Sequence, residues 1–404
     1  MAHREGKRPA GRYDSRVSGR RDPRVLVAPQ TFKGTLDAAT VAAALARGVR
    51  RTWPGAVCRE LPLADGGEGT VRALVRATGG SLEVARVHDP LGRPIDARWG
   101  LLGGGTTAVI EMAAASGLSL LAPDERDPLR ASTRGTGELV LAAAASGAHR
   151  IVVGLGDSAT NDGGAGMARA LGYRFLDRAG RELAEGGAAL LTLHHLEGQP
   201  DPRLVRPLIE AACDVRSPLL GPGGASRVFG PQKGARPDDV ALLERALTRY
   251  AEVLEDFLGR PIRDIAGAGA AGGLGAGLIA FLDARLRPGA ELVLEAVGFV
   301  GELARSDLVV TGEGRFDEQS AGGKVVGAVV RAARAAGVPV IVVAGGTGAA
   351  PATLDALGPA AVEVAAAPGA TAGSADIEDA AARATLHMRD AGGIVSVARV
   401  DRPH

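Results

Sequence analysis

The sequence predicts an α/β protein in which a doubly wound parallel sheet, built from both ends of the chain, is interrupted by a second α/β domain. Three observations predict it. Short β-branched runs alternate with helical patterns in the first eighty residues and again after residue 306. Glycine-rich turns and a hairpin pattern replace that alternation in between. Several strands end in glycines mixed with acidic or hydroxyl residues, as at the ligand-binding edge of an open α/β sheet.

Composition excludes several classes of protein. At 404 residues the chain exceeds one ordinary domain, and 46% hydrophobic residues are ample for a core. A formal net charge of +1 and an aromatic content of 3% argue against nucleic-acid or membrane partners. The two cysteines, Cys58 and Cys213, make neither a disulfide framework nor a metal-ligand spacing. We expect a soluble protein of the reducing cytoplasm, and self-association as a homo-oligomer is left open.

The N-terminal part of the chain begins with a basic segment and then alternates strand and helix. Residues 1–22 are arginine-rich, with almost no apolar content, which predicts a disordered tail and not a secretory signal. In the first helix Thr35 is the expected N-cap and Asp37 lies in the first turn. The alternation implies parallel strands with right-handed crossovers. The predicted strands are at 24–28, 57–63 and 82–87, with helices that begin near Thr35 and Val71.

After residue 88 the rhythm changes, and after residue 306 it returns. Two strands separated by three glycines are typical of an antiparallel hairpin. We infer a doubly wound domain from 23–81 plus 297–404 and an inserted α/β domain at 82–296. The further predicted elements are strands at 95–101, 107–112, 151–156, 208–213, 308–311, 338–344, 362–365 and 394–397, and a helix at 238–258.

The stretch from Ser306 to Lys324 organises the predicted site. Its strand stops at a glycine and becomes a loop that carries Glu313, Arg315 and Asp317, before an apolar helical pattern begins. A surface connection with solvated charges is the alternative. Both signs of charge in one short loop, flanked by glycines, favour a ligand site beyond the carboxyl end of the strand.

Lysine is rare in this chain. Only four of the 47 basic residues are lysine, and one of them, Lys7, lies in the tail. The other three, Lys33, Lys233 and Lys324, each stand beside glycine. A compact ammonium suits a tight phosphate or carboxylate pocket better than a guanidinium fork does.

Acidic and hydroxyl residues at several strand ends predict one carboxylate-lined cleft. Carboxylates with lysines in a glycine-rich cleft suit a nucleotide polyphosphate held with Mg²⁺, whose phosphates would lie on helix starts. For Glu68 and Asp162, a helix N-cap is an equally good interpretation. The residues concerned are Asp65, Glu68, Ser158, Asn161, Asp162, Asp214, Glu313 and Asp317.

The familiar nucleotide-binding motifs are absent from the sequence. Neither the Walker phosphate loop nor the protein-kinase motifs occur. Gly267 to Gly272 matches G-x-G-x-x-G, but it follows a helix and not a strand. Close backbone packing, or a helix start near phosphate, is therefore a better interpretation of this run than a dinucleotide fingerprint.

Eight blocks of sequence, in order and spread over most of the chain, resemble the glycerate kinase type I family. The resemblance implies a Rossmann-like domain interrupted by a second α/β domain. It also implies ATP-dependent phosphorylation of D-glycerate, with 2-phosphoglycerate the product in bacterial members. Asp157 departs from the family pattern, because a glycine is usual there. The blocks lie at 31–33, 64–70, 110–118, 135–139, 158–164, 212–215, 228–234 and 311–315.

The resemblance also implies roles for individual residues. Lys33 and Lys233 would pair with the transferred phosphate or the glycerate carboxylate, and Arg315 would bind a carboxylate through two hydrogen bonds. Asp214 or Asp317 would accept the proton of the attacking hydroxyl. The expected substrate contacts are Asp65, Glu68, Arg315 and Glu313. The expected metal ligands are Asp162 and Glu313, and the expected ATP contacts are Ser158, Asn161, Asp162, Gly163, Gly272 and Lys324.

Two other classes of protein stay open at this point. A non-catalytic binding protein for small hydroxy acids would keep the cleft without phosphoryl transfer. Loss of the lysines or of the acidic loops would favour this class of protein, but this sequence keeps both. A dinucleotide oxidoreductase lacks the strand that should precede Gly267.

Overall fold

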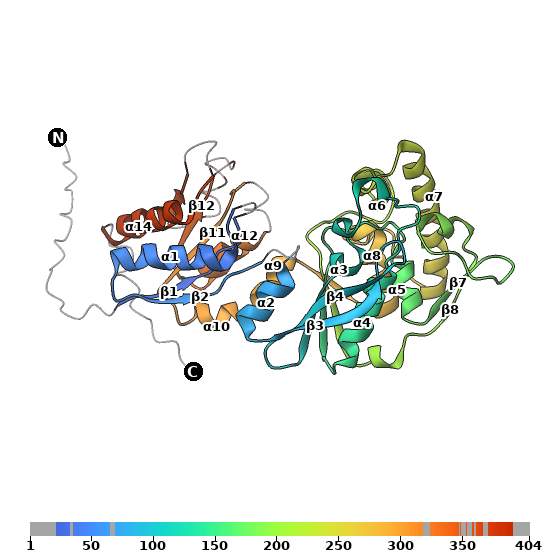
Figure 1. Cartoon of the computed structure of the whole chain (residues 1–404), viewed down its shortest axis with the longest axis horizontal. Coiled ribbons are helices and arrows are strands. Elements are labelled where there is room, and N and C mark those ends of the chain that lie inside the picture. Colours follow the sequence, from blue (N-terminus) through green and yellow to red (C-terminus); the bar gives the residue numbers. More distant parts are fainter. Residues whose placement is uncertain are drawn as a thin grey trace, which may run out of the picture.

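Two sheets organise the chain. The computed structural model describes residues 22–32, 35–64, 69–317, 324–346, 348, 353, 358, 361–366 and 371–390. Figure 1 shows two α/β bodies side by side along the long axis, with segments from both chain ends in the first. The first sheet has five strands in the order β13-β12-β11-β1-β2, and the second has six in the order β10-β9-β6-β5-β4-β3. The predicted α/β class is confirmed.

All neighbouring strands of the first sheet run parallel. Alternate residues of β1 face opposite sides: Val25 and Val27 pack with α1 and α14, whereas Leu26 packs with α12. Helices therefore cover both faces. In chain order the strands run 2-1-3-4-5, so the order reverses between β1 and β11, which is the topological switch point. The elements are β1 (Arg24–Val27), α1 (Ala38–Thr52), β2 (Val57–Glu60), α10 (Phe299–Leu303), β11 (Leu308–Glu313), α12 (Val325–Ala335), β12 (Val340–Ala344), β13 (Ala361–Val364) and α14 (Ser374–Asp390).

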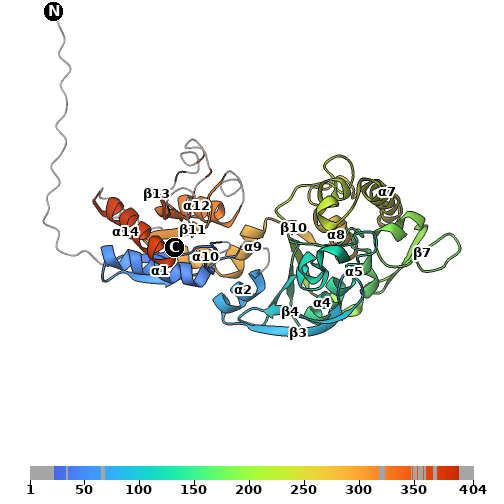
Figure 2. The same ribbon diagram turned by 45° about the horizontal axis from the view of Figure 1, so that its top comes forward.

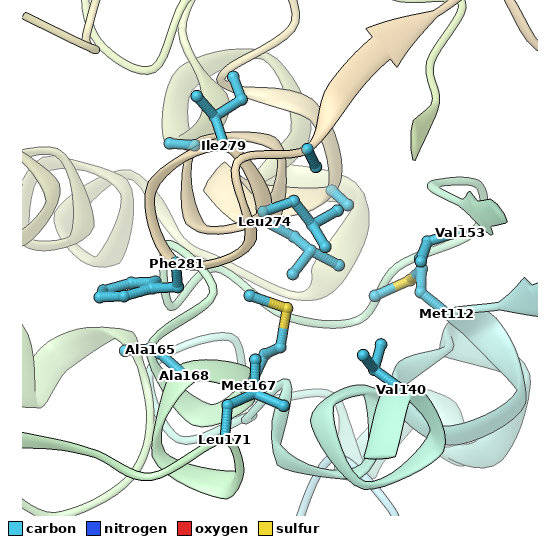
Figure 3. Packing of buried hydrophobic residues seen from close by; sticks show 14 of the residues in the cluster. Met112, Val140, Val153, Ala165, Met167, Ala168, Leu171, Leu274, Ile279 and Phe281 are labelled. Atoms are coloured by element: carbon cyan, nitrogen blue, oxygen red, sulfur yellow. The ribbon is translucent and has the colours of Figure 1, made fainter. Parts of the chain in front are cut away.

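The second sheet is mixed. β3, β4 and β5 pair antiparallel, and β5, β6, β9 and β10 pair parallel. Helices α4, α5, α7 and α8 share one core, in which Val140, Met167 and Leu274 lie (Figure 3). The strands are β3 (Ser81–His88), β4 (Pro94–Leu101), β5 (Thr107–Glu111), β6 (Arg150–Gly154), β9 (Leu208–Ala212) and β10 (Arg285–Arg287), with a separate ribbon of β7 (Tyr173–Leu176) and β8 (His195–Gly198). The helices are α3 (Ala113–Ser116), α4 (Arg134–Ala145), α5 (Ala165–Ala170), α6 (Ala225–Phe229), α7 (Pro237–Leu258) and α8 (Ala270–Leu282), with short 3₁₀ turns at Leu118–Leu120, Pro123–Glu125, Gly187–Thr192, Pro202–Leu204 and Pro231–Lys233.

Two helices lie between the sheets in both views (Figures 1 and 2). They are α2 (Thr70–Thr78) and α9 (Gly289–Ala296). Helix α9 contacts α12 on one side and β9 on the other, and α2 rests on β3, β4 and β5. Leu74 of α2 and Val293 of α9 share a core cluster with residues of both sheets. The domain boundaries at 81 and 297 stay a prediction.

Some expectations from the sequence need correction. Thr35 is not the N-cap of the first helix, because its hydroxyl donates to the Phe32 carbonyl at 2.9 Å. Asp37 caps instead and accepts from the Thr40 N–H at 2.7 Å. The strand expected at 82–87 exists as β3, but it pairs antiparallel with β4 and not parallel as expected. The predicted tail and the strand at 394–397 lie outside the described residues.

The predicted hairpin and the predicted long helix are confirmed. The glycine-separated hairpin is β4–β5, and the long helix is α7. Cys58 and Cys213 are free thiols. Within the described ranges, no helix combines the length and apolarity that crossing a bilayer requires.

The C-terminal end of α7 offers a test of stability against pH. Glu255 accepts the backbone N–H groups of Ile262 and Arg263 and pairs with the Arg263 guanidinium. The hydrogen bonds from Arg263 lower the pKa of Glu255 from 4.5 to about 2. Because the folded pKa is depressed, this stabilisation is complete above pH 4.5 and is lost as the pH falls toward 2. We expect Glu255→Gln to lower the free energy of unfolding by about 1 kcal/mol at pH 7.

Urea unfolding of both proteins between pH 2 and 7 measures this difference. Glu252→Gln is the control, because Glu252 is half exposed and its close ion pair is with Arg249 three residues away. A Glu255→Gln difference that stays constant down to pH 2 would contradict the assignment.

Candidate active site

The switch point brings the carboxyl ends of β1 and β11 together. Beyond β1, the Gln30 N–H donates to the Gly312 carbonyl at 2.8 Å, and the Thr311 hydroxyl donates to the Ala28 carbonyl at 2.7 Å. A side chain at Gly312 would bring a Cβ within 3.0 Å of the Val343 carbonyl on β12, so a glycine is required here. Glu313 ends β11 and is only 7% exposed. It therefore stands at the position where an open α/β sheet binds its ligand.

The loop after β11 is held by Phe316. Its ring is fully buried, its N–H donates to the Gly346 carbonyl at 3.0 Å, and its carbonyl accepts from the Gly348 N–H at 2.8 Å. In extended backbone, neighbouring side chains point away from an inward one. Accordingly Arg315 is exposed and Asp317 is half-buried. The predicted loop thus presents a guanidinium and a carboxylate on a rigid support.

Lys324 stands at the start of α12. It occupies the N-cap position of this 11-residue helix and is half-buried. A cation at a helix N-terminus opposes the helix dipole, so an anion bound between them removes that conflict. The ammonium and the first backbone N–H groups of α12 together suit a phosphate.

The loop after β6, residues 158–164, is buried. Asp162 is 1% exposed, and one carboxylate oxygen accepts from the N–H and hydroxyl of Thr133 at 2.8 and 2.9 Å and from the Gly166 N–H at 3.0 Å. The other accepts from the Gly164 N–H at 3.1 Å. Burial raises the pKa of this carboxyl, and the four donors oppose that rise. Both Asp162 oxygens thus accept hydrogen bonds next to the start of α5, and the metal role expected for Asp162 stays a prediction.

Lys233 is also buried, at 1% exposed, and its ammonium donates to the Thr160 carbonyl at 2.7 Å. Burial lowers the pKa of this lysine to about 7, and the Asp162 carboxylate partly offsets the effect. The expected contact of Lys233 with a transferred phosphate stays a prediction. Asn161 is fully buried as well, and its amide donates to the Ser226 hydroxyl at 3.0 Å.

The glycine run of α8 packs backbone against backbone on the same loop. The Gly163 N–H donates to the Gly272 carbonyl at 3.0 Å. A Cβ on Gly272 would lie within 3.0 Å of both the Thr160 carbonyl and Asn161. Close packing is therefore confirmed for the G-x-G-x-x-G match. Ser158, at the start of the loop, is 7% exposed.

The backbone conformation at residue 157 explains why aspartate can stand where the family pattern has glycine. Its φ is +58°, in the left-handed region that glycine prefers and aspartate tolerates. Its side chain is exposed, so the extra carboxylate does not enter the buried part of the loop.

Two carboxylates of the second sheet cap the bridging helices. Asp214, exposed beyond β9, accepts from the Gly289 N–H at the start of α9 at 2.8 Å. Glu111, at the end of β5, accepts from the Val71 N–H in the first turn of α2 at 2.7 Å. We did not single out Glu111 or Thr133 from the sequence. Glu111 ends a strand, as the predicted site residues do, and that signal could have found it.

The site residues therefore fall into three groups. Glu313, Arg315, Asp317 and Lys324 lie at the carboxyl edge of the first sheet. Asp214 lies at the carboxyl edge of the second sheet, and the buried loop after β6 holds Ser158, Asn161, Asp162 and Gly163 against Lys233 and Gly272. Lys33, Asp65 and Glu68 lie outside the described residues.

A doubly wound sheet with a charged loop at its switch point, joined to a second sheet with carboxylates at its strand ends, defines a class. It is the class of α/β proteins that bind small anionic ligands beyond the carboxyl ends of their strands.

Comparison with known proteins narrows this class to one family. The model of the glycerate kinase family matches residues 25–396. Glycerate kinase of Bacillus subtilis (strain 168) is 50% identical over 323 residues, which are 80% of this chain and 85% of that protein. Glycerate 2-kinase of Escherichia coli (strain K12) is 48% identical over 323 residues, with the same coverage of 80% and 85%. A crystal structure from Salmonella typhimurium LT2, assigned as glycerate kinase 2, has a TM-score of 0.81 and 44% identity and covers 93% of this chain and 98% of that one.

The chain belongs to the glycerate kinase family. It is a kinase that phosphorylates an alcohol group.

Proposed function

We propose that this chain transfers the γ-phosphoryl group of ATP to the C2 hydroxyl of D-glycerate, yielding 2-phosphoglycerate and ADP, in the cytoplasm. The observation that carries the proposal is the loop after β11. There the buried Phe316 is flanked by the exposed Arg315 and the half-buried Asp317, next to the buried Glu313 at the switch point. The names of the related kinases supply the substrate.

Arg315 and Asp317 divide the recognition of glycerate. The exposed Arg315 guanidinium binds the glycerate carboxylate through two parallel hydrogen bonds. Asp317 accepts the proton of the attacking hydroxyl. The oxygen of that hydroxyl forms a bond to the γ-phosphorus while the bond from the γ-phosphorus to the bridging oxygen of ADP breaks. The proton leaves later from Asp317 to water.

The phosphates of ATP lie at the N-terminus of α12, where the Lys324 ammonium and backbone N–H groups neutralise negative charge. Among the described residues, no group of three acidic, histidine or cysteine side chains could hold a metal by itself. Mg²⁺ needs only one or two carboxylates in addition to phosphate oxygens, and Glu313 would supply one of them while Asp317 accepts the proton. When bound, the metal shields the charge of the phosphates.

The two bridging helices, α2 and α9, lie between the second sheet and this site. Asp214 holds the start of α9, which contacts both α12 and β9. We assign Asp214 to positioning this helix, and closure of the two bodies on the substrates would exclude water that otherwise hydrolyses ATP.

A coupled assay tests the proposal. We expect ADP release that requires both D-glycerate and Mg²⁺, and ³¹P NMR should identify 2-phosphoglycerate as the product. Formation of 3-phosphoglycerate would overturn the choice of hydroxyl. Binding of D-glycerate without turnover would favour a sensory protein, and a change in nicotinamide absorbance would favour a dehydrogenase.

A further inference from the structure

We propose that Lys233 is a positioning residue whose buried ammonium holds the loop 158–164, through the Thr160 carbonyl, in the conformation that the reaction requires. The inference rests on the proposed function, because it concerns the same reaction. It differs from the role expected from sequence, in which Lys233 touches the phosphate itself.

The position of the loop gives it this importance. It leaves the carboxyl end of β6, which lies between β5 and β9 in the sheet. On the neighbouring strands, Glu111 ends β5 and Asp214 lies just beyond β9. Each accepts a backbone hydrogen bond from the start of a bridging helix. The conformation of the loop therefore shapes the edge of the sheet where a ligand binds.

Several elements hold the loop, and among the described residues that hydrogen-bond to it Lys233 supplies a cation. The Tyr250 hydroxyl of α7 donates to the Gly163 carbonyl at 2.8 Å, and the loop bonds to Gly272 of α8 and Ser226 of α6. Lys233 itself is fixed by a 3₁₀ turn that starts at Pro231 and ends at a left-handed glycine. Its ammonium, in turn, lies 2.7 Å from the Thr160 carbonyl.

An ammonium at this position costs stability. A charge removed from water pays a desolvation penalty, and a single carbonyl with a nearby carboxylate repays only part of it, as the lowered pKa of Lys233 records. A guanidinium would need more partners, which agrees with a lysine in a chain that otherwise uses arginine.

Further costs gather at the same loop. The Thr160 hydroxyl and the Asn161 carboxamide oxygen are buried with no hydrogen-bond partner among the residues that the structure describes. Asp157 and Ala271, which flank the loop and its packing partner, both have positive φ. Strain and unsatisfied polar groups persist where function maintains them. The loop is therefore held in place for the reaction at the expense of stability.

The test uses the full chain with Lys233→Met, which keeps the volume but removes the ammonium. At a pH well below 7 the lysine is charged both folded and unfolded, so the cost of burying it is fully present and the Met variant avoids it. We expect the Tm of Lys233→Met to equal or exceed that of the wild type. We expect kcat to fall by about 30- to 100-fold with small changes in KM, because a misplaced loop costs transition-state stabilisation.

Lys233→Gln restores a donor without a charge and should recover part of kcat. Arg236→Met is the matched control, because Arg236 is three residues away and its side chain is 83% exposed. Hydrogen exchange should be faster within 158–164 in Lys233→Met and unchanged elsewhere.

The outcomes separate the alternatives. Parallel loss of Tm and kcat in Lys233→Met would reduce the lysine to a structural residue, and full kcat would leave it without a role; either result overturns the proposal. If the wild type shows no D-glycerate-dependent ADP release, the proposed function fails. Hydrogen exchange then still decides whether Lys233 holds the loop, since unchanged exchange within 158–164 would reject it.

Discussion

Replacing Asp317 by asparagine is expected to lower kcat by about 10²- to 10⁴-fold, with little change in KM for ATP or D-glycerate. Asparagine keeps the size and one acceptor oxygen but cannot take the proton of the attacking hydroxyl. Phe316 fixes the loop independently through its buried ring and its bonds to Gly346 and Gly348, so the fold should be unaffected. Steady-state kinetics at saturating ATP measure the effect.

Asp214→Asn is the comparison for this variant. Asp214 accepts a backbone N–H at the start of α9, and an asparagine oxygen can accept the same bond. We expect kcat to fall by less than about tenfold in Asp214→Asn. If Asp317→Asn keeps near wild-type kcat, the proton acceptor has been assigned wrongly. A large loss in Asp214→Asn alone would move that role to Asp214.

Gly272→Ala is expected to lower the free energy of unfolding by more than about 3 kcal/mol. Gly272 has φ +70°, which costs alanine about 1 to 2 kcal/mol by itself. The added Cβ would also lie within 3.0 Å of the Thr160 carbonyl, a backbone atom that cannot move without disturbing the loop. Both effects act at the contact between α8 and the loop after β6. Urea denaturation measures the loss.

Gly301→Ala is the matched control. Gly301 lies in α10, its φ is ordinary, and no heavy atom lies within 4 Å of an added Cβ. Alanine there should be neutral, or stabilising by up to about 1 kcal/mol. Equal unfolding midpoints for the two variants would show that α8 does not press on the loop as described.

The pattern of strand ends could be predicted from the sequence, because it is local. A glycine and an acid after an apolar run mark the carboxyl end of a strand, and β6 and β11 both end in this way, whereas Asp214 follows β9 without a glycine. The alternation of runs also predicted the parallel sheet. It could not predict that the strand at 81–88 pairs with β4, because an apolar run carries no information about which strand lies beside it.

The depth at which a site residue lies could not be predicted. Asp162 and Asp317 look alike in the sequence, because each lies in a polar segment that follows a predicted strand. Asp162 is buried because Thr133, 29 residues earlier, packs against it and donates two hydrogen bonds to its carboxylate. Such contacts depend on how α4 packs against α5.

The first helix shows the same limit at short range. Thr35 and Asp37 are both good N-cap residues. The choice between them depends on which side chain accepts a hydrogen bond from the backbone N–H three residues later. Asp37 accepts from the Thr40 N–H. The Thr35 hydroxyl has its partner behind it at Phe32.

A crystal structure with D-glycerate and a non-hydrolysable ATP analogue tests the central claim most directly. The account predicts the glycerate carboxylate on Arg315, its C2 hydroxyl facing Asp317, and the triphosphate at the N-terminus of α12. Ligands bound away from the ends of β1 and β11, for example in the arginine-lined groove between α1 and α14 at Arg51 and Arg389, would contradict it.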